Sequence, residues 1–485
     1  MTQWQYNSSN AHDFQVNGDH VLFHVPSTAL FYLDPIGSQL ISFLKTTDSV
    51  SERELCQKLS EHANWTEVQQ ALGEFKSLGI IADEPAVNDE KPLNVERFPL
   101  NTVVLNVNTG CNLSCTYCYK EDLETAANGS KMTLETARQS IDLLLVEGSS
   151  QERFNVVFFG GEPLTNLPLI KAAVDYAERR CAEEGKQVDF SMTTNATMLT
   201  EEVVDYLDSH RFGLAVSMDG PKAIHDKNRI TTSGNGTYEV VRRKVAMLLS
   251  RYRSRPVGAR VTLTRGTTDV LAIHQHLKDE LGFFEVGFAP VTAGDIASFN
   301  LTDEELVEVF ANMKALGLQY RDAAVKGINN GFSNMHQLMT DLHEGAKKVL
   351  PCGAGVGLLS VDAKGKLNLC HRFTGSDFPT FGSVTEGVDK PALGNFLETA
   401  ASRANKGCER CRIRNLCAGG CYHESYIQYG DPHHPTYGFC DLMRDWVDFG
   451  ISVYTEILKK NPGFFAQHVT PRTVSRSTLP ATALG

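Results

Sequence analysis

Long hydrophobic runs and an excess of basic residues are both missing from this chain of 485 residues. No stretch of 18 apolar residues occurs, which argues against a membrane-spanning helix. The first residues lack a basic region followed by an apolar core, so we expect no signal peptide and a cytoplasmic location. The formal net charge is −12, whereas nucleic-acid-binding proteins more often carry a basic face. We therefore expect neither a membrane nor a nucleic acid as a partner.

Cysteine, in contrast, is plentiful, with twelve residues that cluster along the chain. In a reducing compartment such clusters indicate metal ligation rather than disulfides. Cys56 and Cys181 stand apart in helical patterns, and we expect them to be small buried hydrophobic side chains. The other ten form two groups: Cys111, Cys115 and Cys118, and then Cys352, Cys370, Cys408, Cys411, Cys417, Cys421 and Cys440.

The first group places three thiols within eight residues, directly after the apolar stretch 102–108. Three cysteines can bind three irons of a four-iron cluster and leave the fourth iron open for chemistry. The alternative is a zinc knuckle, but zinc sites usually take four ligands in C-x2-C pairs, and a C-x3-C-x2-C trio fits that pattern poorly.

Strand and helix patterns alternate from about residue 98 to 320, which predicts an α/β domain. Strands that read as continuous apolar runs, each followed by a helix, indicate a parallel sheet covered by helices. Six such units favour a partial (β/α)6 barrel, in which the active site gathers at the carboxyl ends of the strands. Thr302 and Glu305 form a capping box that starts a helix over 303–318. The strand candidates are 102–108, 154–159, 188–193, 212–218, 257–264 and 284–290.

Residues 10–86 have the pattern of a small separate domain. The segments 20–25 and 29–33 predict a hairpin, and two helices follow, with capping boxes at Ser51/Glu54 and Thr66/Gln69. Strands, helices and a short closing strand of this size suggest a winged-helix module. DNA binding is the usual role of such modules, but the acidic chain argues against it.

The remaining segments have weaker patterns. A polar linker follows the first domain over about 84–97. Cysteine, glycine and turn residues dominate 345–445, so we expect this segment to owe its order to bound metal more than to an apolar core. The tail over 462–485 has little periodicity and is expected to be weakly ordered.

Further motifs follow successive strand candidates. Glycines let the backbone approach a ligand closely, and a carboxylate favours an ammonium group. Together with the C-x3-C-x2-C run and its aromatic residue before the last cysteine, these motifs resemble the radical S-adenosylmethionine (radical SAM) family. They are Gly160-Gly161-Glu162 after the second strand, Asn195 after the third, and Ser217 and Asp219 after the fourth, with Arg229 beyond.

The resemblance implies that Cys111, Cys115 and Cys118 bind a [4Fe–4S] cluster. In that family the amino and carboxylate groups of S-adenosylmethionine (SAM) chelate the open iron, and one electron cleaves SAM to a 5′-deoxyadenosyl radical. Glu162 would hold the SAM amino group, and Arg229 would pair with its carboxylate. The full set of implied SAM-binding residues is Tyr117, Gly160, Gly161, Glu162, Asn195, Ser217, Asp219 and Arg229.

The second cysteine group resembles the SPASM domain, an extension of radical SAM enzymes that modify peptides and proteins. The resemblance implies two auxiliary [4Fe–4S] clusters, hence three clusters in all. One would be held by Cys408, Cys411, Cys417 and Cys440, and the other by Cys352, Cys370 and Cys421. The second set is one ligand short, and 353–369 contain no cysteine, so we expect an open iron or a non-cysteine ligand there. A zinc ribbon at Cys408 and Cys411 is the alternative.

Within that family the chain is most similar to the maturases of quinohemoprotein amine dehydrogenase, from the stretch 25–33, the cysteine pattern and 369–373. The resemblance implies thioether crosslinks between a cysteine and the β-carbon of Asp or γ-carbon of Glu in the dehydrogenase γ subunit. The N-terminal module would bind the peptide by strand addition. An auxiliary cluster would accept the leftover electron, and flavodoxin or ferredoxin would be the external donor.

Three alternatives stay open. Another SPASM maturase could form thioethers in sclerotised peptides or formylglycine in sulfatases, although the missing cysteine in 353–369 weakens the sulfatase option. The chain could also be a non-enzyme, either an iron–sulfur electron carrier or a zinc-binding peptide scaffold. No general base is identified by the sequence.

Overall fold

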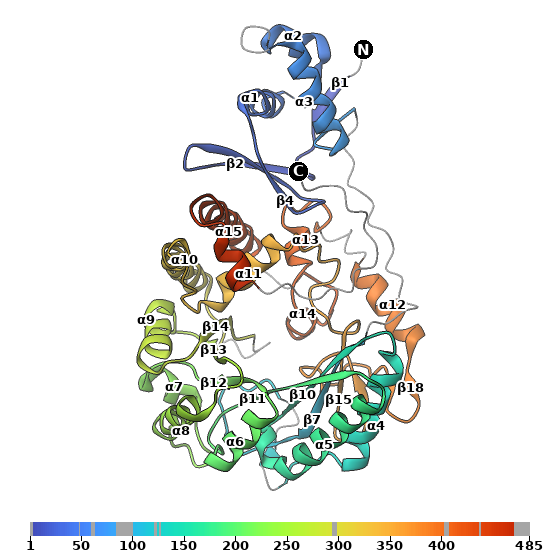
Figure 1. The fold of residues 1–485 in the computed structure, drawn as a ribbon, viewed down its shortest axis with the longest axis vertical. Coiled ribbons are helices and arrows are strands. Elements are labelled where there is room, and N and C mark those ends of the chain that lie inside the picture. Colours follow the sequence, from blue (N-terminus) through green and yellow to red (C-terminus); the bar gives the residue numbers. More distant parts are fainter. Residues whose placement is uncertain are drawn as a thin grey trace.

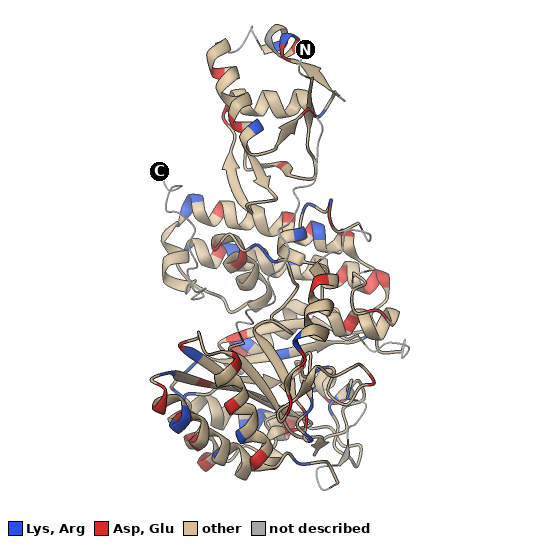
Figure 2. Ribbon diagram, turned by 90° about the vertical axis from the view of Figure 1, so that its right-hand side faces the viewer, with Lys and Arg blue, Asp and Glu red and all other residues tan. Residues whose placement is uncertain are grey.

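The computed structural model describes residues 3–47, 49–59, 64–83, 100–120, 124–125, 128–292, 298–401, 407–435 and 438–469. An N-terminal domain lies at one end of an elongated molecule and a helix-covered sheet at the other, with the C-terminal helices between them (Figure 1). Within the described residues no helix is both long and apolar enough to cross a membrane. Basic and acidic residues are interspersed along the ribbon (Figure 2).

The central sheet confirms the six predicted strands and their parallel direction. Its strands follow the order β14-β13-β12-β11-β10-β7, and each neighbouring pair is parallel. All their carboxyl ends therefore meet at one edge, as a partial barrel requires. The strands are β7 (Thr102–Asn108), β10 (Arg153–Gly160), β11 (Gln187–Thr194), β12 (Gly213–Ser217), β13 (Val257–Leu263) and β14 (Glu285–Pro290).

Helices cover the outer face of this sheet (Figure 1). Phe158, Phe190 and Phe212 are fully buried beneath them, with ring centroids 5.4–6.3 Å apart. Burial of such large apolar side chains contributes most of the stability of the layer. The helices are α4 (Leu134–Glu147), η1 (Pro163–Asn166), α5 (Leu167–Glu183), α6 (Glu201–Ser209), α7 (Lys222–Asn228), α8 (Tyr238–Arg251), α9 (Val270–Gln275) and the π-helix η2 (His276–Glu280).

The C-terminal segment extends this sheet, which the sequence did not predict. Strand β15 (Leu358–Val361) pairs in parallel with β7, and β16 (Leu367–Asn368) pairs antiparallel with β15. Leu359, Val361 and Leu367 are at most 2% exposed and belong to the main core. The expectation that 345–445 depends on metal more than on apolar packing is therefore wrong for this part. The strand was missed because its apolar run is only four residues long.

The other C-terminal elements complete the middle of the molecule. The predicted capping box is confirmed at the start of α10 (Asp303–Val325), which packs on α15 (Cys440–Lys460) and is longer than expected. Helix α16 (Gly463–His468) corrects the expectation of a weakly ordered tail from 462, because Phe464 and Phe465 are fully buried. The rest are β8 (Gly110–Cys111), β9 (Glu124–Thr125), α11 (Ser333–His343), β17 (Gly382–Ser383), β18 (Gly387–Val388), α12 (Lys390–Ala401), α13 (Arg414–Cys417) and α14 (Tyr422–Tyr429).

The N-terminal domain has its own apolar core and two small sheets. The predicted hairpin is confirmed, with β3 antiparallel to β4, and so is the Ser51/Glu54 capping box. The box predicted at Thr66/Gln69 is wrong, because Asn64 and Glu67 cap that helix instead. The elements are β1 (Gln3–Tyr6), β2 (Ala11–Val16), β3 (Asp19–His24), β4 (Ala29–Tyr32), α1 (Pro35–Leu44), β5 (Val50–Ser51), α2 (Glu52–Leu59), α3 (Trp65–Ser77) and β6 (Ile81–Ala82).

The limits of this domain differ from the expected 10–86. Strand β1 pairs with β5 and β6, so the domain already includes Gln3–Tyr6. The predicted linker over 84–97 lies outside the described residues, as does the side chain of Cys56. Cys181, by comparison, is 2% exposed in α5, which confirms its interpretation as a buried hydrophobic side chain.

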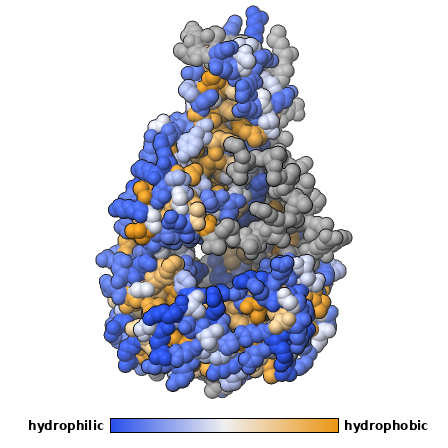
Figure 3. All heavy atoms as spheres, in the orientation of Figure 1, coloured by the Kyte–Doolittle hydropathy of each residue, from blue (hydrophilic) through white to orange (hydrophobic). Residues whose placement is uncertain are grey.

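Two side chains of the C-terminal segment attach the N-terminal domain to the rest of the chain. Arg414 donates hydrogen bonds to the Ser9 carbonyl and to Oδ1 of Asn10, and Asn415 donates to the Val25 carbonyl at 2.8 Å. Both belong to the short helix α13, between Cys411 and the C-terminal end of that helix at Cys417. Hydrophobic residues also gather where the two parts meet (Figure 3).

Candidate functional site

The three-cysteine loop begins at the carboxyl end of β7, where the parallel sheet places an active site. Burial raises the pKa of Cys111 to about 12, and the neighbouring Cys115 and Cys118 thiols act in the same direction. The three thiols thus converge, and they fit a cluster that would bind each of them through a different iron. Among the described residues no three His, Cys, Asp or Glu side chains are arranged to hold a single metal ion.

Two glycines let the Gly160-Gly161-Glu162 motif pack very closely against this loop. A Cβ atom on Gly160 would lie 2.3 Å from the Asn108 carbonyl oxygen, and one on Gly161 would lie 2.4 Å from that of Gly110. Gly160 also has a φ of 147°, which side chains disfavour. The Gly161 amide donates to the Asn108 carbonyl at 2.8 Å. The glycines therefore fix the cysteine loop against the end of β10.

Glu162 is 1% exposed, and protein donors already engage both of its oxygens. Oε1 accepts from the Thr194 hydroxyl at 2.7 Å and the Leu164 amide at 3.2 Å, while Oε2 accepts from the Asn195 amide at 2.8 Å. Burial raises the pKa of Glu162 to about 7, although these hydrogen bonds oppose the shift. A cationic ligand beside it would favour the carboxylate form.

Asn195 reaches the cysteine loop as well as Glu162. Its Nδ2 donates to Oδ1 of Asn112 at 3.0 Å and lies 3.9 Å from the Cys111 sulfur. Its Oδ1 accepts from the Thr197 hydroxyl at 2.6 Å. The observed contacts of Asn195 thus support the loop that carries the thiols.

Asp219 and Arg229 are buried and form a cluster with the half-buried Tyr117 at the cavity wall. The Arg229 guanidinium donates from Nε to Asp219 Oδ2 at 2.9 Å and from Nη2 to Oδ1 at 3.1 Å. Asp219 also accepts from the Tyr117 hydroxyl at 2.6 Å and from the Thr262 amide at 3.0 Å. Four protein donors thus engage the two oxygens of Asp219, which orients Arg229 and Tyr117 beside the cavity.

A cavity of about 310 Å³ opens over the carboxyl ends of the strands. Every sequence-predicted SAM residue except Asp219 lines it, together with all three cysteines of the loop. The predicted residues on its wall are Cys111, Cys115, Cys118, Tyr117, Gly160, Gly161, Glu162, Asn195, Ser217 and Arg229. The strand-end motifs and the thiols therefore meet in one place.

Sequence reasoning missed four charged residues of the same wall: Lys120, which directly follows the cysteine loop and Tyr119, and Arg260, Arg372 and Glu424. Arg372 pairs with Glu424 at 2.7 Å, and its Nη1 lies 3.8 Å from the Cys421 sulfur. Arg260 interrupts the apolar run of β13, and a charged residue inside such a strand was the available signal. Arg372 and Glu424 come from a distant segment and carry no local signal.

The seven C-terminal cysteines interact electrostatically in two groups. Burial raises the pKa of Cys417 to about 11, and the Cys411, Cys408 and Cys440 thiols act in the same direction. Burial likewise raises the pKa of Cys370 to about 12, and the Cys421 and Cys352 thiols add to that rise. One group thus has four thiols and the other three, donor sets that would fit one complete and one incomplete four-iron cluster.

Residues 105–272 match the sequence profile of the Radical SAM superfamily. Among curated proteins, the chain is 22% identical over 364 residues to the radical SAM cyclopropyl synthase TigE of Paramaledivibacter caminithermalis, covering 71% of this chain and 72% of the other. It is 24% identical over 347 residues to a cysteine-type anaerobic sulfatase-maturating enzyme of Clostridium perfringens, covering 67% of this chain and 89% of the other.

Two solved structures share the fold. The first is anSMEcpe with bound AdoMet and Cp18Cys peptide, with a TM-score of 0.60, 19% identity, and 76% and 99% of the two chains covered. The second is Streptococcus suis SuiB bound to its precursor peptide SuiA, with a TM-score of 0.52, 14% identity, and 90% and 99% covered. Both likenesses show the fold alone.

Proposed function

We propose that this chain, which is a radical SAM enzyme, forms thioether crosslinks between a cysteine and an acidic side chain within a peptide substrate. We propose further that the substrate is the γ subunit of quinohemoprotein amine dehydrogenase. When bound, SAM and its cluster would supply a hydrogen-abstracting radical, and the auxiliary clusters an electron acceptor. Relatives named for peptide maturation support the general class.

The observation that carries this proposal is the position of Cys421 relative to the cavity. Arg372 lines the cavity that contains the three-cysteine loop, and the same side chain lies 3.8 Å from the Cys421 sulfur. Cys421 belongs to the set with three thiols, which leaves one iron of a four-iron cluster without a cysteine. A substrate thiolate held at that iron would lie beside the cavity in which a carbon radical forms, and such positioning can contribute on the order of 7–11 kcal/mol.

Crosslinking requires the removal of two hydrogens from the substrate. One leaves the carbon as a hydrogen atom and forms 5′-deoxyadenosine, and the other leaves the thiol as a proton, with one electron passed to an acceptor. This chain would bind both reacting side chains, hold Arg229 and Tyr117 in place through Asp219, and keep the thiol on the Cys421 side of the cavity.

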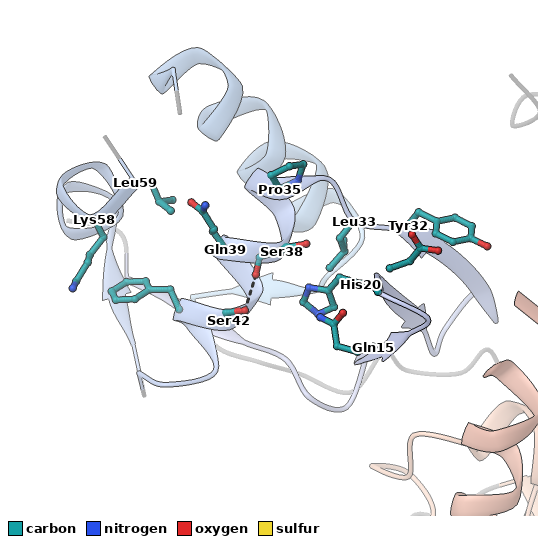
Figure 4. Close-up of a pocket in the computed structure, with 13 residues that line it drawn as sticks. Gln15, His20, Tyr32, Leu33, Pro35, Ser38, Gln39, Ser42, Lys58 and Leu59 are labelled. Carbon is teal, nitrogen blue, oxygen red and sulfur yellow. Dashed lines mark hydrogen bonds between the residues drawn. The ribbon is translucent and has the colours of Figure 1, made fainter. Parts of the chain in front are cut away.

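The N-terminal domain would bind the peptide outside the reaction cavity. Among the described strands β4 pairs with β3 alone, so its other edge is open for an added strand. Phe31 and Tyr32 on β4 are 37% and 50% exposed. A hollow of about 850 Å³ adjoins β4, and His20, Leu33 and Ser38 face it from the hairpin and α1 (Figure 4).

The proposal also includes the compartment in which the reaction takes place and the protein that donates the electron. We place the reaction in the cytoplasm, before export of the modified subunit, with flavodoxin or ferredoxin as the electron donor. The eleven cysteines with described side chains form no disulfide with one another, as a reducing compartment favours.

The test is anaerobic co-expression with the γ subunit, followed by mass spectrometry of the subunit. We expect the loss of two hydrogens per crosslink, and no loss when the substrate cysteine is replaced by serine. Formylglycine formation in a sulfatase peptide, without crosslinks in the γ subunit, would assign the chain to the sulfatase maturases instead. Zinc in place of iron, with no 5′-deoxyadenosine released under dithionite, would overturn the enzymatic assignment.

A further inference from the structure

The reaction cavity is lined by more cationic side chains than carboxylates. Two carboxylates, Glu162 and Glu424, line it together with four cations: Lys120, Arg229, Arg260 and Arg372. Arg229 is paired with Asp219, and Arg372 with Glu424. Lys120 donates to the His371 and Thr374 carbonyls. Among these cations, only the Arg260 side chain has no hydrogen bond or ion pair with any described residue.

Arg260 lies on the inner face of the sheet. The neighbouring strand β14 has a glycine there and leaves space for the Arg260 side chain. Arg260 is opposite Ser217 on β12 and Gly287 on β14. A Cβ atom on Gly287 would stand 2.7 Å from Nη1 of Arg260, so the guanidinium occupies the space that the missing side chain leaves. The glycine thus sets the place of the guanidinium over the sheet.

Arg260 comes from the strand that follows the last of the SAM-binding motifs. Those motifs follow β7, β10, β11 and β12, whereas Arg260 comes from β13, opposite Ser217 at the end of β12 and on the side of the sheet away from the cysteine loop. Arg229 already provides a cation near the Cys115 thiol, where the two interact electrostatically. A second cation at β13 is therefore available to an anion other than the SAM carboxylate.

We propose that Arg260 binds the side-chain carboxylate of the acidic substrate residue and thereby selects Asp or Glu for crosslinking. This inference rests on the proposed function. A guanidinium fork matches a carboxylate with two parallel hydrogen bonds, which fixes its orientation as well as its position.

The chemistry of the two acidic residues makes this anchor useful. The β-carbon of Asp and the γ-carbon of Glu are both the methylene directly bonded to the carboxylate carbon. An anchored carboxylate therefore places the reacting methylene at the same distance from Arg260 in either residue, whatever the length of the chain that connects it to the backbone. One cavity can then present both residues to the same radical, since orientation of the reacting bond is the main requirement.

The test measures binding rather than turnover. Two synthetic γ-subunit peptides, which differ only by Asp→Asn at one crosslink position, are titrated anaerobically into the cluster-loaded, SAM-bound enzyme. We expect the wild type to prefer the Asp peptide by about 10- to 100-fold, as a lost charged hydrogen bond implies. Arg260→Gln should abolish this preference, and Arg260→Lys should retain part of it because the charge remains without the fork.

Gly287→Ala provides an independent variant. It leaves the charge in place but displaces the guanidinium, whose flexible end can move, so we expect the preference to fall between those of the wild type and Arg260→Gln. Arg242→Gln, on the exposed outer helix α8, is the matched control and should keep the full preference.

The outcomes separate this inference from the function on which it rests. Crosslinks in the γ subunit together with an unchanged Asp preference in Arg260→Gln would overturn the role of Arg260 and leave the function intact. An Arg260→Gln variant that loses affinity for SAM but keeps the Asp preference would assign Arg260 to the SAM carboxylate. A wild type that binds both peptides equally would also contradict the inference, whether or not crosslinks are found.

Discussion

The loop with Cys111, Cys115 and Cys118 and the seven C-terminal cysteines bring thiols together in different ways. The loop is one short segment at the end of β7, pressed against the Gly160-Gly161 turn. The C-terminal thiols come from separate elements, including the N-termini of α14 and α15, and depend on the packing of 352–440. Local spacing therefore sets the first arrangement, and tertiary packing sets the second.

The largest contrast is expected between one cysteine of each region. Under the proposed function, Cys115→Ala should abolish release of 5′-deoxyadenosine, because Cys115 would be a ligand of the cluster whose iron is open. Cys417→Ala should remove one auxiliary cluster, or about four of the roughly twelve irons, and leave that release in place while crosslinks disappear. Iron analysis and chromatography of 5′-deoxyadenosine check both. Loss of 5′-deoxyadenosine in Cys417→Ala would show that the two regions do not function separately.

The ion pairs of the two regions should differ in energy. Asp219→Asn leaves Arg229 without its counter-charge in a site where the side chains are 9% and 2% exposed, and should cost about 3–5 kcal/mol of unfolding free energy. Glu424→Gln affects a pair that is 22% and 21% exposed, and should cost about 1 kcal/mol. Urea denaturation measures both values. Equal losses would mean that burial does not distinguish the regions.

The pH dependence of stability should reflect Glu162 in the cysteine-loop region. Burial raises its pKa from an ordinary 4.5 to about 7. Because the folded state holds the proton more tightly, the stabilisation is complete below the unfolded pKa and is lost as the pH rises through 7. Relative to Glu162→Gln, which does not titrate, the wild type should lose on the order of 3 kcal/mol between about pH 4 and pH 8. Denaturant melts of both apoproteins across this range test the sign.

The smallest expected difference in stability is between two glycine substitutions, one near the cysteine loop and one near the C-terminal cysteines. Gly161→Ala introduces a Cβ 2.4 Å from the Gly110 carbonyl oxygen and should cost about 1–3 kcal/mol while lowering the iron content of the loop. Gly353→Ala, next to Cys352, meets no atom within 4 Å and should change stability by less than about 0.5 kcal/mol. Thermal melts and iron analysis compare them. A stable, fully loaded Gly161→Ala would contradict the role given to the turn.

The sequence predicted the six-stranded parallel sheet because each strand is a continuous apolar run with a helix after it. It also predicted ten of the residues that line the cavity, since motifs at successive strand ends must meet at one edge of a parallel sheet. It did not predict β15, whose four residues are too few for a clear pattern. Nor did it predict that Asp219 accepts hydrogen bonds from both Arg229 and Tyr117, because the partners of a side chain cannot be read from a motif.

By itself, the sequence determined the cysteine loop, the six parallel strands with their helices and the residue types of the strand-end motifs, all of which depend on neighbours close along the chain. Only the tertiary structure decided that Arg372 connects the cavity to Cys421, that Arg260 lies over Gly287, and that Asp219 supports Arg229 and Tyr117. The physical reason is that these contacts join residues on different strands or distant segments, and their geometry exists only once the sheet and the C-terminal segment have packed together.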